Sequence, residues 1–154
     1  MRAMLSETPG RPESLKLVEM LSKPLGRGQV RVATRAAGVN FPDTLIIQDK
    51  YQFKPPRPFA PGHEIAGDIT EVGEGVTSVR AGDHVIVAWS APCGSCRFCI
   101  DRRQPNLCSN VSIASMGRYH FHQDGHPLAG FAGTGTWAEA MILPHQGVVK
   151  IDPD

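Results

Sequence analysis

Short runs of alternating apolar and polar residues recur along the chain and are separated by turn residues. Residues 1–5 and 15–20 form two such runs, and Val30 and Val32 alternate with polar neighbours within residues 28–37. A period of two is typical of a strand that buries one face. The N-terminal part of the chain is therefore predicted to fold as a hairpin followed by a half-buried strand.

The later part of the chain continues this pattern, with one interruption that favours a helix. Pro42 and Asp43 predict the start of a short helix, because proline is tolerated in a first helical turn. Residues 54–61 contain four prolines and predict an extended loop, and the glycine-rich residues 109–135 are expected to be irregular. Further strands are predicted at residues 62–76, 84–88, 137–143 and 148–151.

The spacing of the turns indicates the fold class. Turns recur at about every ten residues, as in β-barrels and sandwiches. No G-x-G-x-x-G sequence lies between a strand and a long helix, which is the pattern of a dinucleotide-binding unit. We therefore predict a mainly β domain with few short helices.

Length and composition agree with one globular domain over residues 1–154. A domain of this size buries roughly 68–70% of its unfolded surface, and 41% hydrophobic with 20% charged residues is typical of a folded chain. A net charge of +1 without a basic run gives no reason to expect nucleic acid or a membrane as a partner. The N-terminus lacks a signal-peptide pattern and no apolar run could span a bilayer, so a cytoplasmic protein is expected.

The cysteines carry the strongest chemical signal in the sequence. Cys93, Cys96 and Cys99 are separated by two residues each, and Cys108 follows after eight more. In a chain without a signal peptide, such a cluster indicates a metal rather than disulfides. Zinc takes four ligands in a tetrahedron, and four thiolates leave no open position. The sequence therefore predicts a structural zinc, with Gly94 allowing the tight turn between the first two ligands.

Two other interpretations of the cysteines are weaker. An iron–sulfur site would continue with three residues and then a Cys-Pro pair, which does not occur here. A redox-active C-x-x-C pair is expected in a βαβ setting, which the pattern of the chain does not favour.

Several motifs of the chain occur together in a fixed order. They are residues 62–67 (Gly-His-Glu-Ile-Ala-Gly), 72–76 (Val-Gly-Glu-Gly-Val), 82–85 (Gly-Asp-His-Val) and the four cysteines. In this order they resemble the catalytic domain of the medium-chain dehydrogenase/reductase superfamily, over essentially the whole chain. The resemblance implies a GroES-like, partly open β-barrel with a zinc-binding lobe at about residues 90–112.

Features of two branches of that superfamily are combined. Residues 37–45 resemble the zinc-free quinone reductases, whereas residues 125–128 and 131–137 resemble the zinc alcohol dehydrogenases. The cysteine quartet also belongs to the zinc branch, where the last gap is usually seven residues. The gap of eight residues before Cys108 is interpreted as a loop insertion.

The resemblance implies a candidate catalytic centre. Zinc dehydrogenases hold a catalytic zinc through a cysteine of this domain, the histidine of Gly-His-Glu and a residue of the following nucleotide-binding domain. His63 matches the histidine, and Glu64 matches the adjacent glutamate, which either supports the ligands from outside or serves as an alternate ligand, but Asn40 occupies the position of the cysteine. An amide oxygen is a far poorer zinc ligand than a thiolate, so a second, catalytic zinc is doubtful. Trp89 matches a position that lines the substrate pocket, or else is an ordinary aromatic residue at the barrel end.

The resemblance also implies what the protein does and what lies beyond residue 154. Residues 148–154 resemble the exit into a Rossmann domain, which is expected next and would supply the binding site for NAD or NADP. The chain is then an excised domain, a truncated product or part of a split enzyme, and is expected to be inactive alone. The implied function is hydride transfer between nicotinamide and an alcohol or carbonyl compound. The resemblance also implies a homodimer.

Two alternatives to that function stay open. One is an NADPH-dependent quinone or enone reductase without catalytic zinc, to which Asn40 and residues 37–45 point. The other is a stand-alone zinc-stapled barrel that serves as a binding module.

Overall fold

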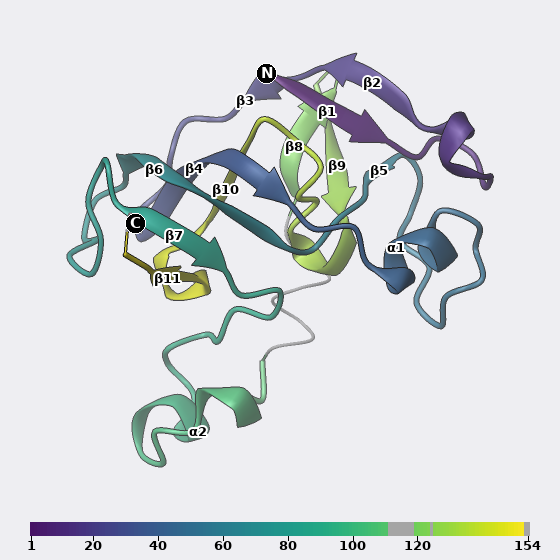
Figure 1. Ribbon diagram of the computed structural model, residues 1–154. Helices are drawn as coiled ribbons and strands as arrows, with labels where there is room; N and C mark the ends of the chain where they lie inside the picture. The colour runs from purple at the N-terminus through teal and green to yellow at the C-terminus, as the bar shows by residue number, and fades with distance from the viewer. Residues whose placement is uncertain (111–118, 124, 153–154) are drawn as a thin grey trace.

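The computed structural model describes residues 1–110, 119–123 and 125–152, and it shows a mainly β chain (Figure 1). The strands are β1 (Arg2–Leu5), β2 (Lys16–Glu19), β3 (Leu21–Ser22), β4 (Gln29–Ala37), β5 (Phe59–Ala60), β6 (Ile65–Val72), β7 (His84–Val87), β8 (Tyr119–Gln123), β9 (His126–Gly130), β10 (Ala140–Pro144) and β11 (Val148–Lys150). The α-helices are α1 (Phe41–Ile46) and α2 (Arg97–Ile100), and short 3₁₀ turns η1 to η4 lie at Pro12–Ser14, Pro105–Leu107, Phe131–Gly133 and His145–Gly147. The prediction of a mainly β fold with few short helices is confirmed.

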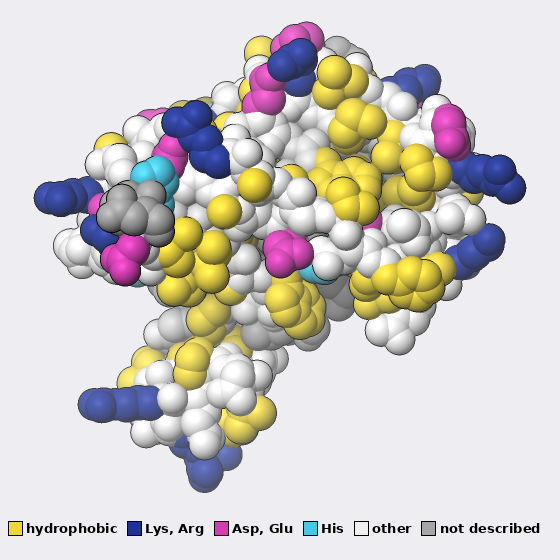
Figure 2. Space-filling model, viewed as in Figure 1, with side chains coloured by type: hydrophobic (Ala, Val, Ile, Leu, Met, Phe, Trp, Pro, Cys, Tyr) yellow, Lys and Arg dark blue, Asp and Glu magenta, His cyan; other side chains and the backbone are white. Residues whose placement is uncertain are grey.

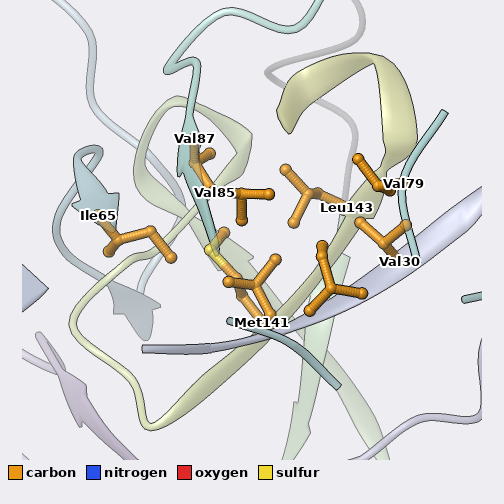
Figure 3. Packing of buried hydrophobic residues seen from close by; sticks show 9 residues of the cluster. Val30, Ile65, Val79, Val85, Val87, Met141 and Leu143 are labelled. Atoms are coloured by element: carbon orange, nitrogen blue, oxygen red, sulfur yellow. The ribbon is translucent and has the colours of Figure 1, made fainter. Parts of the chain in front are cut away.

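The largest sheet has five antiparallel strands in the order β10-β4-β6-β7-β11. It curls around an apolar core to which most of its strands contribute (Figure 3). Val30 and Val32 point into this core from β4, as their alternation with polar residues predicted. The remaining members of the core are Ile65, Ile69, Val79, Val85, Val87, Met141 and Leu143.

Two smaller sheets close the rest of the barrel. β1 and β2 form a hairpin, and β3, β8, β9 and β5 form a four-stranded sheet in that order. Isolated bridges join Ala3 to Ala138, just before β10, and Ser6 to Phe59 of β5, so the N-terminal segment is tied to β5 and to the chain that leads into β10. Phe59 is completely buried and packs in the apolar cluster that also covers α1 through Ile46.

The expectation that residues 109–135 are irregular is wrong within the part that the structure describes. β8 and β9 pair as antiparallel strands, with Phe121 opposite Leu128. Both side chains are buried in the core that also holds β1. Both strands are short, and β9 contains Pro127 and Gly130, so burial in the assembled barrel defines them rather than local propensity. Residues 111–118 and 124 lie outside the described residues.

The segment after β7 leaves the barrel and forms a separate lobe around α2 (Figure 1). Figure 2 shows it as a projection below the body of the molecule, with Lys and Arg side chains at its lower end. The predicted lobe at residues 90–112 is described as far as residue 110. None of the helices in the described part of the chain has the length and apolar character needed to cross a bilayer.

Candidate functional site

The lobe brings all four cysteine sulfurs together. The four Sγ atoms lie within 4.8 Å of one another, with 3.5 Å between Cys96 and Cys99 and 3.9 Å between Cys96 and Cys108. Sulfurs bound to one zinc at about 2.3 Å are separated by about 3.8 Å in a tetrahedron, whereas a disulfide has about 2.05 Å. All four cysteines are free of disulfides. Their spacing therefore fits a shared ion.

Backbone amides of the lobe point at the sulfurs. The amides of Ser95 and Cys96 donate to the Cys93 sulfur at 3.4 and 3.2 Å, and the Cys93 amide donates to the Cys108 sulfur at 3.3 Å. Gly94 takes a φ of +69°, a conformation that suits glycine and makes the turn between the first two ligands.

The thiols of the lobe differ in acidity. The hydroxyl and amide of Ser95 donate to the Cys93 sulfur and lower the pKa of this thiol to about 5. The backbone of Cys99 likewise lowers the pKa of Cys96 to about 7. Burial, and then the neighbouring Cys96 thiol, raise the pKa of Cys99 to about 11. Amide donors favour thiolates, and thiolates are the form that binds zinc, so the donor set fits a structural zinc ion.

A second cluster of polar side chains lies where the loop before β6 meets the start of α1. Gly62 has a φ of +90°, and a Cβ atom there would lie 2.4 Å from the Thr136 hydroxyl and 2.5 Å from a ring carbon of Trp137. Only glycine allows this close approach. The loop is anchored further by the Glu64 amide, which donates to the Thr136 hydroxyl at 3.2 Å. His63 and Glu64 are thereby held beside the helix.

The three candidate catalytic residues meet in this cluster. Asn40 directly precedes α1, and its side-chain amide donates to the Glu64 carboxylate at 2.7 Å. His63 is largely buried and packs edge-on against Phe131, with ring centroids 5.2 Å apart. We call Asn40, Asp43, His63 and Glu64 the polar centre.

Asp43 is a member of the polar centre that the sequence reasoning missed. Its carboxyl is completely buried and lies 3.2 Å from Nδ1 of His63. It also accepts a hydrogen bond from the Asn40 backbone amide at 2.8 Å. Asp43 is the third residue of α1, three positions after the N-cap residue Asn40, and an acidic side chain at this position is a capping signal. That signal marks the helix start, but nothing in the sequence indicates the contact with His63.

Trp137 is a second aromatic residue beside the polar centre, in addition to Phe131. The Trp137 indole N–H donates to the Gly38 carbonyl at 3.1 Å. Trp89 is 60% exposed and, among the described residues, makes no hydrogen bond or ring contact with the polar centre. A mostly apolar groove of about 490 Å³ runs beside Trp137, between β1, β2 and the end of β4, and is lined in part by Met4, Leu17 and Val39.

Comparisons with known proteins match this chain to dehydrogenases. Residues 26–153 match the family model described as the alcohol dehydrogenase GroES-like domain. S-(hydroxymethyl)glutathione dehydrogenase of Escherichia coli is 35% identical over 159 aligned positions, which cover 99% of this chain and 42% of that protein.

Solved structures agree with these sequence matches. A thermostable alcohol dehydrogenase from Pyrobaculum aerophilum is 32% identical with a TM-score of 0.74, covering 100% of this chain and 41% of that one. Benzyl alcohol dehydrogenase from Acinetobacter calcoaceticus is 25% identical with a TM-score of 0.79, covering 99% and 41%. The chain thus spans less than half the length of the proteins it matches.

Proposed function

Because this chain belongs to the alcohol dehydrogenase GroES-like domain family, we propose that it is the catalytic domain of a zinc-containing, NAD(P)-dependent oxidoreductase. The enzyme transfers hydride between nicotinamide and an alcohol or carbonyl compound. The single observation that carries the proposal is the family match over residues 26–153, in a chain whose relatives are dehydrogenases of alcohols and of a hydroxymethyl thiol adduct.

The four thiols of the lobe would hold a structural zinc ion. Such an ion cross-links the segment from Cys93 to Cys108 and contributes its binding energy to folding, on the order of 10 kcal/mol in small zinc peptides. With four thiolates there is no position left for substrate, so the lobe takes no part in the chemistry.

The polar centre would contact the reacting oxygen of the substrate. Nδ1 of His63 faces Asp43, so the other ring nitrogen is the one that remains for a substrate oxygen. Asp43 is a positioning residue, since it acts through His63. The apolar groove beside Trp137 would hold the carbon skeleton of a small substrate.

Two groups of substrates fit the family. Alcohols and aldehydes are indicated by the names of the relatives. Quinones and enones are favoured by Asn40, which stands where a zinc dehydrogenase has its ligand cysteine. NAD or NADP would be held by a nucleotide-binding domain, because the described residues contain no glycine-rich phosphate turn at the start of a long helix.

A chimera tests the proposal. In S-(hydroxymethyl)glutathione dehydrogenase of Escherichia coli, the segment that aligns with this chain is replaced by residues 1–154. We expect the chimera to oxidise NADH or NADPH in the presence of an aldehyde, quinone or enone, measured by the loss of nicotinamide absorbance. The 154-residue chain alone is expected to show no turnover.

One control variant and one contradicting outcome make the result decisive. His63→Ala in the chimera should abolish turnover without changing nucleotide affinity, because His63 belongs to the polar centre. A chimera that folds and binds the nucleotide, yet turns over none of these substrate classes, would contradict the proposed function.

A further inference from the structure

Side chains that a zinc dehydrogenase aims at its catalytic metal are here engaged with one another. The Asn40 side-chain amide donates to the Glu64 carboxylate at 2.7 Å. The group that faces Glu64 is therefore an N–H donor, which has no lone pair to offer a cation. Gly38 leaves the space for this contact, since a Cβ atom there would lie 2.3 Å from the same Glu64 oxygen.

The second pair in the polar centre is equally complete. Both oxygens of the buried Asp43 carboxylate have partners, Nδ1 of His63 at 3.2 Å and the Asn40 backbone amide at 2.8 Å. Asp43 therefore holds the His63 ring through Nδ1 and caps α1. His63 keeps a single ring nitrogen for another partner.

A count of ligands shows that a zinc ion does not fit this centre. Catalytic zinc takes three protein ligands and an open position. This chain offers one nitrogen of His63 and the carboxylate of Glu64, so even with a third ligand from a nucleotide-binding domain Glu64 would have to give up its hydrogen bond from Asn40. Among the described residues, the only side chains close enough to form a metal site of three or more ligands are the four cysteines.

We propose that Asn40 closes the polar centre to zinc, so that the chain carries one zinc ion, in the lobe. The polar centre then contacts the substrate oxygen through hydrogen bonds and not through a metal ion. This inference rests on the proposed function for the role of the centre. Its consequence concerns the substrate. Hydride addition to an isolated carbonyl gives an alkoxide that is about as basic as hydroxide and is therefore costly to form without a metal ion.

Conjugated substrates delocalise the negative charge, which makes the resulting anion less basic than an alkoxide. When hydride from reduced nicotinamide bonds to the β-carbon of an enone, the C=C electron pair shifts and the carbonyl becomes an enolate. Water then supplies a proton to the α-carbon, which leaves a saturated ketone, hydroxide and oxidised nicotinamide. A quinone similarly gives a phenolate, whose pKa is about 10 as in tyrosine. A centre without zinc therefore selects quinones or enones over simple aldehydes.

Metal analysis of the chimera, which joins residues 1–154 to a nucleotide-binding domain, and of three variants of it tests the inference. Protein purified with zinc under reducing conditions is dialysed against a weak chelator, and the zinc is counted. Asn40→Cys supplies the thiolate that the centre lacks, and Asn40→Ala is the matched control that removes the amide without adding a ligand. A Cys93→Ser/Cys96→Ser double variant tests which site holds the wild-type ion.

We expect about one zinc ion per chain in the wild type and in Asn40→Ala, about two in Asn40→Cys, and none in the double variant. Two ions in the wild type, or one ion that survives in the double variant, would overturn the inference. A single ion in folded Asn40→Cys would show that Asn40 is not what excludes the metal. Because the wild-type count needs neither a variant nor turnover, it separates this inference from the proposed function.

Discussion

The lobe and the polar centre are both clusters of polar side chains, but they differ in whether those side chains find hydrogen-bond partners within the cluster. In the lobe, four sulfurs converge within 4.8 Å and receive only weak donors from nearby amides. In the polar centre, a carboxylate meets an amide at 2.7 Å and a second carboxylate meets an imidazole at 3.2 Å. We therefore expect the lobe to depend on an ion for its stability, whereas the groups of the polar centre are paired with one another.

The two regions also differ in their attachment to the barrel. None of the three apolar clusters contains a residue from between Cys93 and Cys99 or from α2. The polar centre lies against the cluster that includes Phe131, on which the His63 ring packs. Loss of the ion should therefore unfold the lobe while the barrel stays folded. Substitutions in the polar centre should instead destabilise the barrel.

The largest effect is expected from Cys108→Ser, which removes the most buried ligand of the lobe. Zinc binding should be lost, together with a binding energy that is on the order of 10 kcal/mol in small zinc peptides. Hydrogen exchange should become fast throughout residues 93–108 and stay slow in β4 and β6. Metal analysis and hydrogen exchange measure the two effects.

Asn110→Ala is the matched control for that substitution. Asn110 contacts the Cys93 sulfur at 3.5 Å as a donor and is not a ligand, so this variant should keep its zinc. If Cys108→Ser retained zinc with the wild-type affinity, the four-thiol site would be wrong.

A smaller effect is expected from Asp43→Asn in the polar centre. The carboxylate of Asp43 contacts both the Asn40 backbone amide and Nδ1 of His63, one through each oxygen. The asparagine side chain has only one acceptor oxygen, so one of these two buried contacts is lost. We expect the free energy of unfolding to fall by about 1–3 kcal/mol, with zinc content unchanged. Urea unfolding measures the loss. Asp101→Asn, an exposed change in the lobe, should leave stability within about 0.5 kcal/mol of the wild type.

A still smaller effect is expected from Gly38→Ala. Its Cβ atom would lie 2.3 Å from a Glu64 carboxylate oxygen and 3.2 Å from the Glu64 Cβ, so this side chain must move away from Asn40. The displaced group is mostly the end of a flexible side chain, so we expect a cost of about 1 kcal/mol. In a Glu64→Ala background the same substitution should cost less, because nothing is left to displace. Equal costs in both backgrounds would show that Glu64 does not occupy this space.

How much of this could be predicted differs between the fold and the site. Val30 and Val32 identified β4, because the strand alternates regularly on a buried core. β6 follows the period of two only as far as Ile69, since a bulge shifts the register and leaves Val72 37% exposed. β8 and β9 were missed because Phe121 and Leu128 become core residues only when the barrel closes around them.

The site shows the same division between local and long-range information. The cysteine cluster lies within one short segment, so spacing alone predicted the convergence that the structure shows. Asn40 and Glu64 are 24 residues apart, and Asp43 and His63 are 20 apart. No periodicity or motif spacing encodes that these pairs touch, because their contact depends on how the loop at Gly62 packs against Trp137.

The smallest expected effect is a pH dependence that belongs to the barrel and not to the lobe. The Lys150 ammonium at 2.6 Å and the Arg80 amide at 2.9 Å lower the pKa of Asp83 below its usual value of 3.8. A carboxyl whose folded pKa is depressed stabilises the protein above its unfolded pKa, and this contribution is lost as pH falls through the folded pKa. Asp83→Asn should therefore reduce stability at pH 7, and the difference from wild type should shrink below about pH 4.

Urea unfolding of wild type and variant, at pH 7 and below about pH 4, measures the contribution of the Asp83 carboxyl alone. Asp68 and Glu139, whose pKa values are also lowered by arginine partners, contribute equally to both proteins. Glu13→Gln is a suitable control, since Glu13 is exposed and forms no salt bridge within the described residues. The zinc content of Asp83→Asn should equal that of the wild type at pH 7, because the Asp83–Lys150 contact joins the start of β7 to β11 and touches no lobe residue. A difference that stayed constant from pH 7 to pH 2 would mean that packing, and not charge, explains the loss.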